Sequence, residues 1–183
     1  CAGTVAKLSK KYQTFFLIIT NSEFYDQNKK IIRKKEIANN ELNNSIKILK
    51  VKKVFNLDLK TNDIKFDDEA KIKYLKIIDQ VKPETVFVHS QNDTHLDHQI
   101  VSNFITSMSK KIKNIIHYKS NFYHFNKKFN PNLYIDISKE FEKKIESLKC
   151  YKTELKRVKN SWIKLIKIEN SLYGNITNTK YAE

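Results

Sequence analysis

The chain is poor in glycine, proline and cysteine, with two of each among its 183 residues. Tight turns rely on glycine and proline, so this composition argues against a β-sandwich of many turns and against a long flexible linker. The two cysteines, Cys1 and Cys150, are too few for a disulfide scaffold and lack the paired spacing of a structural zinc site. We therefore expect the protein in the reducing cytoplasm.

Long apolar runs and targeting sequences are also lacking. The longest apolar run, residues 15–19, has the length of a strand and falls far short of the ~20 residues of a membrane helix. The N-terminus shows no signal-peptide pattern. An apolar content of 40% in this length suits one core, and no compositional break or repeat divides the chain. We predict no membrane span and a single domain over residues 1–183.

Acidic residues are outnumbered, and the formal net charge is +15. Such a charge raises the question of a nucleic acid or an anionic membrane as partner. However, the lysines are spread along the whole chain and arginine is nearly absent, whereas a nucleic-acid interface prefers clustered arginine and stacking aromatics. We expect a small-molecule substrate and no nucleic acid; steeply salt-dependent binding would support the opposite interpretation. The oligomeric state is left open.

Helix-like and strand-like segments alternate along the chain, which is the pattern of βαβ units and a parallel sheet. Residues 14–20 are apolar on both faces, as a buried parallel strand should be. The predicted strands are residues 14–20, 53–57, 85–88, 112–118 and 133–137. The predicted helices are residues 6–12, 35–49, 70–81, 140–159 and 162–172, with a further helix whose inner face is Ile100, Val101, Phe104, Ile105 and Met108. The predicted fold class is α/β.

The most informative segment is residues 89–98, HSQNDTHLDH, directly after a predicted strand. It holds three of the five histidines and two carboxylates. Imidazole has an unperturbed pKa near neutrality and is the commonest metal ligand, so histidines beside aspartates indicate a metal site or an acid/base site. In open parallel sheets the ligand crevice lies beyond the carboxyl ends of the strands. Location and chemistry therefore agree.

Simpler interpretations stay open. The segment 89–98 is alternatively a solvated polar loop, and Asp97 is alternatively the N-cap of the following helix, because aspartate is a leading cap residue. The aromatic-rich residues 118–129, with His117 and His124, predict either a surface loop that packs aromatics onto the core or a lid over the site.

Several segments of the sequence resemble a known protein family. The segment VKPETVFVHSQNDTHLDHQIV, residues 81–101, resembles the second motif of the LmbE-like, or PIG-L, de-N-acetylases, a strand followed by H-x-x-x-D-x-H-x-D-H. Further segments resemble the family in order: NLDL at residue 56, FNPNLYIDIS at residue 129, KKIESLKCYKT at residue 143 and the closing NTKYAE. The resemblance covers essentially the whole chain.

This resemblance implies a Rossmann-like three-layer α/β fold with a mainly parallel sheet, and a catalytic Zn²⁺ or another divalent metal. A catalytic zinc keeps three protein ligands and one position for a water, whose pKa it lowers. By the family pattern, His98 is a metal ligand, and His95 stabilises the oxyanion or protonates the leaving amine. Asp97 is implied to orient a histidine.

The family's first motif, a strand followed by H-P-D-D-E, would run directly into CAGTVAKL, with which the chain begins. In the family that motif supplies the other metal ligands and the general base. We therefore expect that the chain is truncated at its N-terminus, lacks the first strand, is slightly truncated at its C-terminus, and is inactive by itself. His89, Asp93 and Glu23 lie near family positions but are interpreted as structural or peripheral.

The sequence thus leads to two hypotheses of different classes. In the first, the parent protein is a cytoplasmic, metal-dependent hydrolase that removes an acetyl group from an N-acetylated amino sugar or its conjugate. In the alternative, the chain is a non-catalytic sugar-binding domain of the same fold.

Overall fold

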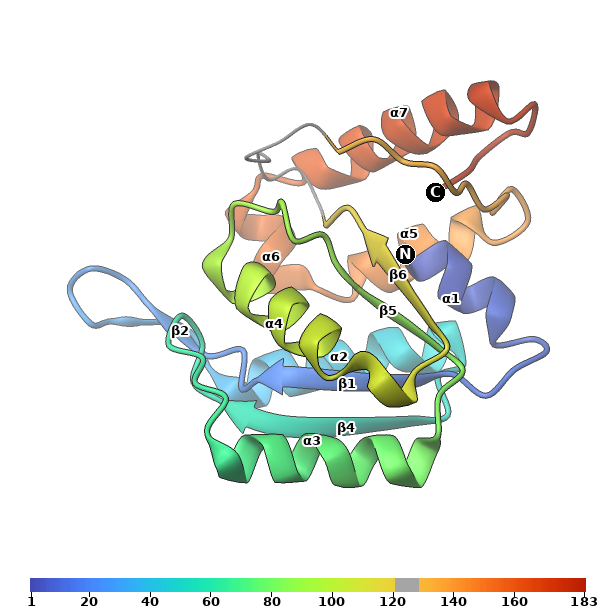
Figure 1. Ribbon diagram of the computed structural model, residues 1–183. Helices are drawn as coiled ribbons and strands as arrows, with labels where there is room; N and C mark the ends of the chain where they lie inside the picture. Colours follow the sequence, from blue (N-terminus) through green and yellow to red (C-terminus); the bar gives the residue numbers. More distant parts are fainter. Residues whose placement is uncertain (121–128) are drawn as a thin grey trace. The chain divides into compact units, whose positions relative to one another are not determined.

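The computed structural model describes residues 1–120 and 129–183 (Figure 1). The chain forms two compact units. One consists of Cys1–Phe16, Glu23–Val54 and Pro131–Glu183, and the other of Leu17–Ser22 and Phe55–Asn130. The surface loop or lid predicted for residues 118–129 falls largely on residues 121–128, which lie outside the described residues.

Four strands make two parallel pairs. β1 (Phe15–Thr20) pairs with β4 (Lys53–Leu59), and β5 (Thr85–His89) pairs with β6 (Asn114–Tyr118). The β5–β6 register is parallel from Thr85–Asn114 to His89–Tyr118. Hydrogen bonds from Lys52 N–H to the Thr14 carbonyl (2.9 Å) and from Asn21 N–H to the Leu59 carbonyl (2.8 Å) bracket the β1–β4 pair. Pairing thus advances in the same direction on both strands, as the βαβ pattern predicts.

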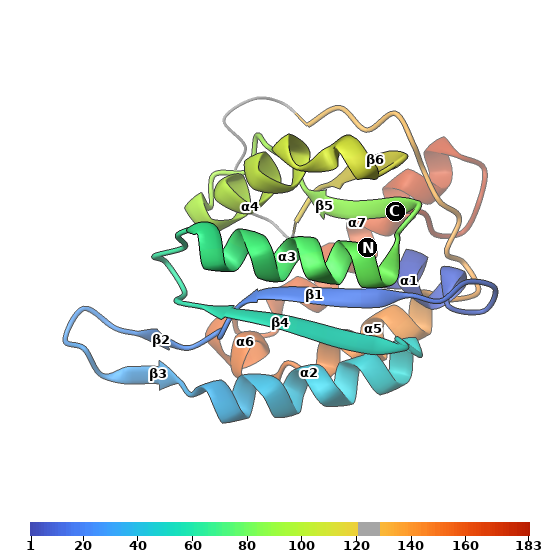
Figure 2. The same cartoon turned by 60° about the horizontal axis from the view of Figure 1, so that its bottom comes forward.

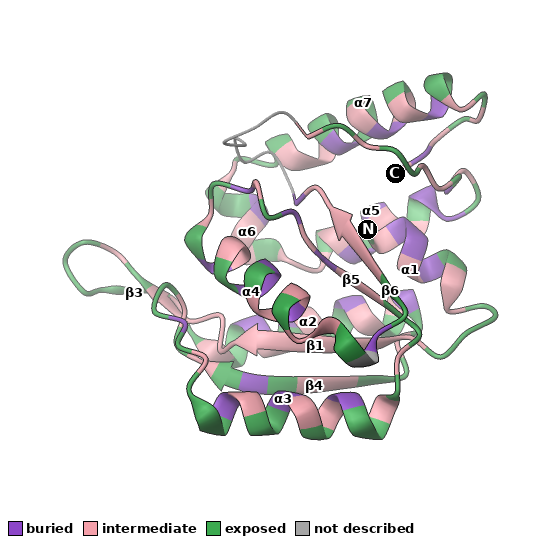
Figure 3. Ribbon diagram, in the orientation of Figure 1, coloured by how far each residue is buried: buried purple, intermediate pink, exposed green. Residues whose placement is uncertain are grey.

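The unit that contains Phe55–Asn130 has two helices, α3 (Asp68–Val81) and α4 (Leu96–Ser107), which follow β4 and β5 (Figure 2). Apolar side chains at helical spacing point from both helices into one core with the strands. That core consists of Leu57, Ile64, Tyr74, Ile78, Val88, Val101, Ile105 and Ile112. Phe104 and Met108, predicted for the inner face of α4, pack against it, whereas Ile100 is 37% exposed. Figure 3 shows buried residues recurring at intervals along α3 and α4.

The remaining unit is mainly helical. Its elements are α1 (Ala2–Leu8), β2 (Phe24–Tyr25), β3 (Ile31–Arg33), α2 (Lys35–Leu49), α5 (Phe141–Lys149), α6 (Lys152–Arg157) and α7 (Ser161–Ile176). The bounds predicted for α2 are confirmed. The helix predicted for residues 6–12 begins instead at Ala2, and the antiparallel hairpin of β2 and β3 was not predicted.

One long helix predicted for residues 140–159 is two helices, and the prediction was wrong there. The chain leaves the helical conformation at Tyr151 (φ −84°, ψ 64°). The buried carboxylate of Glu41 on α2 accepts hydrogen bonds from the backbone N–H and the hydroxyl of Thr153, both at 2.7 Å. The Glu41 carboxylate thus accepts a backbone N–H at the start of α6, as a capping side chain would. A residue distant in the sequence therefore stabilises the break between α5 and α6.

The strand predicted for residues 133–137 is reduced to an isolated antiparallel bridge between Asp136 and Ala182. Backbone hydrogen bonds join Ile135 with Glu183 and Ile137 with Tyr181. Within the described residues, Cys1 and Cys150 are both free thiols. None of the helices described is long and apolar enough to cross a membrane.

Candidate active site

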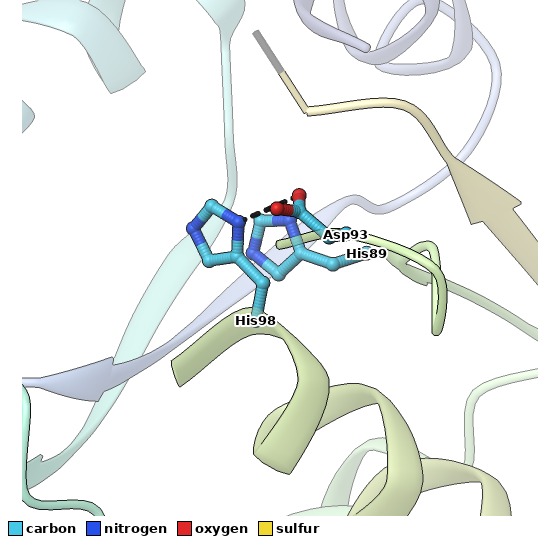
Figure 4. Close-up of side chains that lie close together, drawn as sticks. All are labelled: His89, Asp93 and His98. Atoms are coloured by element: carbon cyan, nitrogen blue, oxygen red, sulfur yellow. Dashed lines mark hydrogen bonds and ion pairs between the residues drawn. The ribbon is translucent and has the colours of Figure 1, made fainter. Parts of the chain in front are cut away.

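The site lies where β5 ends and the chain turns into α4. Ser90 N–H continues the strand pairing by donating to the Tyr118 carbonyl (2.9 Å), and Asp93 N–H then donates to the Ser90 carbonyl (3.2 Å). The turn places His89, Asp93 and His98 side by side (Figure 4). A loop at the carboxyl end of a parallel strand therefore carries the site, as expected for this class of sheet.

Asp93 is the central carboxylate of this turn, and its side chain is fully buried. One oxygen accepts a hydrogen bond from His95 N–H (2.9 Å). The other oxygen lies 2.8 Å from His98 Nδ1 and accepts the hydroxyl of Ser120. Burial would raise the pKa of Asp93, but the hydrogen bonds from Ser120, His95 and His98 together lower it. Asp93 is thus an anion stabilised by three donors.

Three imidazoles gather against this carboxylate. The rings of His89 and His98 are stacked, with centroids 3.9 Å apart and planes 6° apart. His95 stacks on His98 at 4.5 Å. Burial, and after it the nearby His98, lowers the pKa of His89 to about 3 and also lowers the pKa of His95. Both His89 and His95 are therefore neutral at physiological pH.

His89 is anchored from three sides. Its backbone carbonyl accepts the Ser102 hydroxyl (2.7 Å) and lies 3.0 Å from His117 Nδ1. Its Nε2 lies 3.3 Å from the Tyr118 hydroxyl. Its buried Nδ1 has no hydrogen-bond partner among the residues that the structure describes.

Asp97 has a separate contact. Its carboxylate accepts the backbone N–H of Asn62 (2.9 Å) from the turn after β4, and Asp97 is 7% exposed. The helix α4 begins at Leu96 with His95 at the N-cap position, so Asp97 lies in the first turn. The interpretation of Asp97 as the N-cap was therefore wrong. The negative charge of Asp97 nevertheless raises the pKa of His95, against the larger effects of burial and His98.

More than half of the chain matches a known protein family. The family model described as PIG-L, GlcNAc-PI de-N-acetylase, matches residues 1–109. The chain belongs to the PIG-L family.

Solved structures of similar fold include the conserved protein TT1542 from Thermus thermophilus, with a TM-score of 0.79 and 20% identity over 100% of this chain and 85% of that chain. The N,N'-diacetylchitobiose deacetylase from Pyrococcus horikoshii is similar with a TM-score of 0.74 and 20% identity, covering 100% of this chain and 75% of that one. GalB, the 4-carboxy-2-hydroxymuconate hydratase from Pseudomonas putida, is similar with a TM-score of 0.74 and 16% identity, covering 100% of this chain and 87% of that one. These likenesses confirm the Rossmann-like α/β fold.

Within this PIG-L domain, three residues offer atoms that could bind a divalent cation. His89, Asp93 and His98 each offer a ligand atom, and these atoms lie within 4.8 Å of one another. A histidine backed by a carboxylate is the arrangement that metal sites commonly use, and the Asp93–His98 contact has this form. Because the rings of His89 and His98 are parallel and stacked, one ion cannot lie in both ring planes. His98 is therefore the best candidate ligand for the ion, and Asp93 contacts Nδ1 of its ring.

The residues predicted from the sequence of this PIG-L domain meet here in part. His95 and His98 lie together, while Asp97 is directed to Asn62 as well as influencing His95. Asp93, interpreted as structural or peripheral, contacts His98. Ser120 was not singled out. Its place just after β6, the parallel neighbour of β5, is the signal that could have indicated it.

Proposed function

We propose that the protein is a metal-dependent hydrolase that removes an acetyl group from an N-acetylated amino sugar or its conjugate. The observation that carries this proposal is the pair His95 and His98, stacked at the carboxyl end of β5 in a chain of the PIG-L family. The similar structure from Pyrococcus horikoshii, a deacetylase of N,N'-diacetylchitobiose, supports this substrate class.

The fold alone does not decide the reaction, since the similar GalB is a hydratase. The site must therefore carry the argument. Hydrolysis of an amide needs a group that stabilises the oxyanion and a proton for the leaving amine. His95 suits the first need, because it is a partly buried N–H donor next to the candidate metal ligand. It can protonate the leaving amine only in its imidazolium form, which the charge of Asp97 favours.

His98 would hold Zn²⁺ or another divalent metal, with Asp93 orienting its ring. When bound, such a metal lowers the pKa of a water and polarises the amide carbonyl. Asp97 would act on His95 through its charge, which favours the protonated form of that imidazole. The roles of His95, Asp97 and His98 in catalysis are part of the proposal.

The test is release of acetate from N-acetylglucosamine and from N,N'-diacetylchitobiose by the gene product that contains these residues. We expect acetate to appear, to cease after removal of metal by a chelator, and to return on addition of Zn²⁺. Saturable binding of either sugar without acetate release, unaffected by the chelator, would contradict the proposal and support a non-catalytic sugar-binding domain.

A further inference from the structure

The contacts of Asp93 also determine which nitrogen of the His98 ring carries a proton. A carboxylate can only accept hydrogen bonds, and burying one is costly unless donors surround it. Asp93 is fully buried, and each of its side-chain oxygens faces a donor. The backbone around it is also held, because its carbonyl accepts the Gln99 amide (2.5 Å) and its N–H donates to Ser90. The carboxylate therefore has little freedom to turn away.

The contact at 2.8 Å between Asp93 and His98 Nδ1 fixes where a proton lies. Since the ionised carboxylate offers no hydrogen, Nδ1 must carry one. Neutral imidazole has a single N–H, so Nε2 then holds the lone pair. This tautomer is the one that leaves Nε2 able to bind a cation or accept a proton.

Ser120 reinforces the same choice. It is buried, follows β6, and donates its one hydroxyl hydrogen to the oxygen of Asp93 that faces His98. Its own oxygen lies 3.1 Å from His98 Nδ1 and can only accept there. Two acceptors from different segments thus converge on a single ring nitrogen.

We propose that Asp93 and Ser120 are positioning residues that hold His98 in the Nδ1–H tautomer and present its Nε2 to the reaction. The effect on catalysis rests on the proposed function, whereas the tautomer is a property of the folded chain alone. Asp93 dominates because it carries the charge and the shorter contact. Ser120 fixes the orientation of that carboxylate.

The tautomer is measured directly by long-range ¹H–¹⁵N correlation spectra of the histidine rings, recorded without added metal at about pH 8.5, above the ordinary pKa of histidine. The His98 signals are those lost in His98→Gln. In the wild type we expect a protonated Nδ1 and an unprotonated Nε2. A wild-type His98 protonated at Nε2 would overturn the proposal.

Variants separate the two positioning residues. Asp93→Asn should convert His98 mainly to the Nε2–H form, because the amide can donate to Nδ1. Ser120→Ala should give a mixture, and Ser120→Thr, which keeps the hydroxyl, should restore the wild-type spectrum. Ser102→Ala is the matched control, since Ser102 is also a buried serine, and it contacts the His89 carbonyl instead.

Retention of the wild-type tautomer in both Asp93→Asn and Ser120→Ala would overturn the proposal, and should Asp93→Asn fail to fold, Ser120→Ala and Ser120→Thr decide it. In the acetate assay, Asp93→Asn should lower kcat about 10- to 100-fold with little change in KM. If the expected tautomers are found but the wild type releases no acetate, the proposed function fails and the positioning role stands.

Discussion

The two aspartates on either side of His95, Asp93 and Asp97, have different surroundings and different contacts. Asp93 is fully buried and contacts His98, while Asp97 lies in the first turn of α4 and accepts the Asn62 N–H. The sequence alone does not distinguish their roles, because both are acidic residues two positions from His95. Their partners decide the difference: one carboxylate orients a ring, and the other joins α4 to the turn after β4.

Substitutions at Asp97 separate its structural contact from its charge. Asp97→Ala should lower the free energy of unfolding by ~1–3 kcal/mol, because the Asn62 N–H loses its acceptor. Asp97→Asn keeps an acceptor oxygen and should lose less than ~1 kcal/mol, while still losing the charge that acts on His95. Urea unfolding measures both. Equal losses in the two variants would mean that the hydrogen bond to Asn62 is not what Asp97 contributes to stability.

At the scale of the element, α3 depends on its first residues. Asp67 precedes the helix with extended backbone, and its side chain accepts the Ala70 N–H (2.8 Å). Asp68 and Glu69 follow in the first turn, where negative charge favours the helix dipole. The helix therefore begins two residues before the start predicted from its apolar pattern.

Removing this cap should be measurable. Asp67→Ala is expected to lower the free energy of unfolding by ~1 kcal/mol, as loss of an N-cap side chain usually does. The matched control is Asp68→Ala, because the Asp68 side chain is 94% exposed and its pairing with Lys71 lies in solvent; it should change stability by at most ~0.5 kcal/mol. A larger loss in Asp68→Ala than in Asp67→Ala would contradict the capping role.

The elements also show what local sequence can and cannot predict. The helix α2 and the parallel strands carry their own periodicity, and their predicted positions are confirmed within a few residues. The break before α6 depends on Glu41, more than a hundred positions away, so no local pattern signals it. The same is true of the candidate site. His95 and His98 can be predicted from their spacing, whereas the hydrogen bond from Ser120 to Asp93 forms only when β6 lies beside β5.

At the scale of the whole molecule, a buried ion pair joins residues far apart in the sequence within one unit. Glu183 pairs with Lys144 of α5 and accepts the Thr4 N–H of α1. Burial would raise the pKa of Glu183, but the amino terminus and Lys144 lower it to about 2 from an ordinary value of 4.5. Since this pKa is depressed by folding, the pair stabilises the fold fully above about pH 4.5. That stabilisation is lost as the pH falls toward 2.

Acid unfolding should report this pair. Lys144→Met is expected to lower the free energy of unfolding by about 3 kcal/mol at pH 7, because Glu183 stays buried without its ion-pair partner. The difference between wild type and variant should shrink as the pH falls from 4.5 toward 2, followed by thermal unfolding at several pH values. A difference that is constant over this range would rule out Glu183 as its source.

The family model places the chain in the PIG-L family, and the site must account for the chemistry. What distinguishes the molecule is a single turn in which two imidazoles stack on His98, whose ring contacts one buried carboxylate. The central claim is that His98, held in this turn, is the residue around which the acetyl group is removed.

The most direct measurement compares acetate release by wild type, His98→Ala and Asn103→Ala in the gene product that contains these residues. Asn103 is exposed on the same helix and serves as the control. We predict that His98→Ala loses at least ~1,000-fold in kcat, in the range of lost catalytic groups, together with its bound divalent metal. Asn103→Ala should keep wild-type activity. Full activity in His98→Ala would contradict the account.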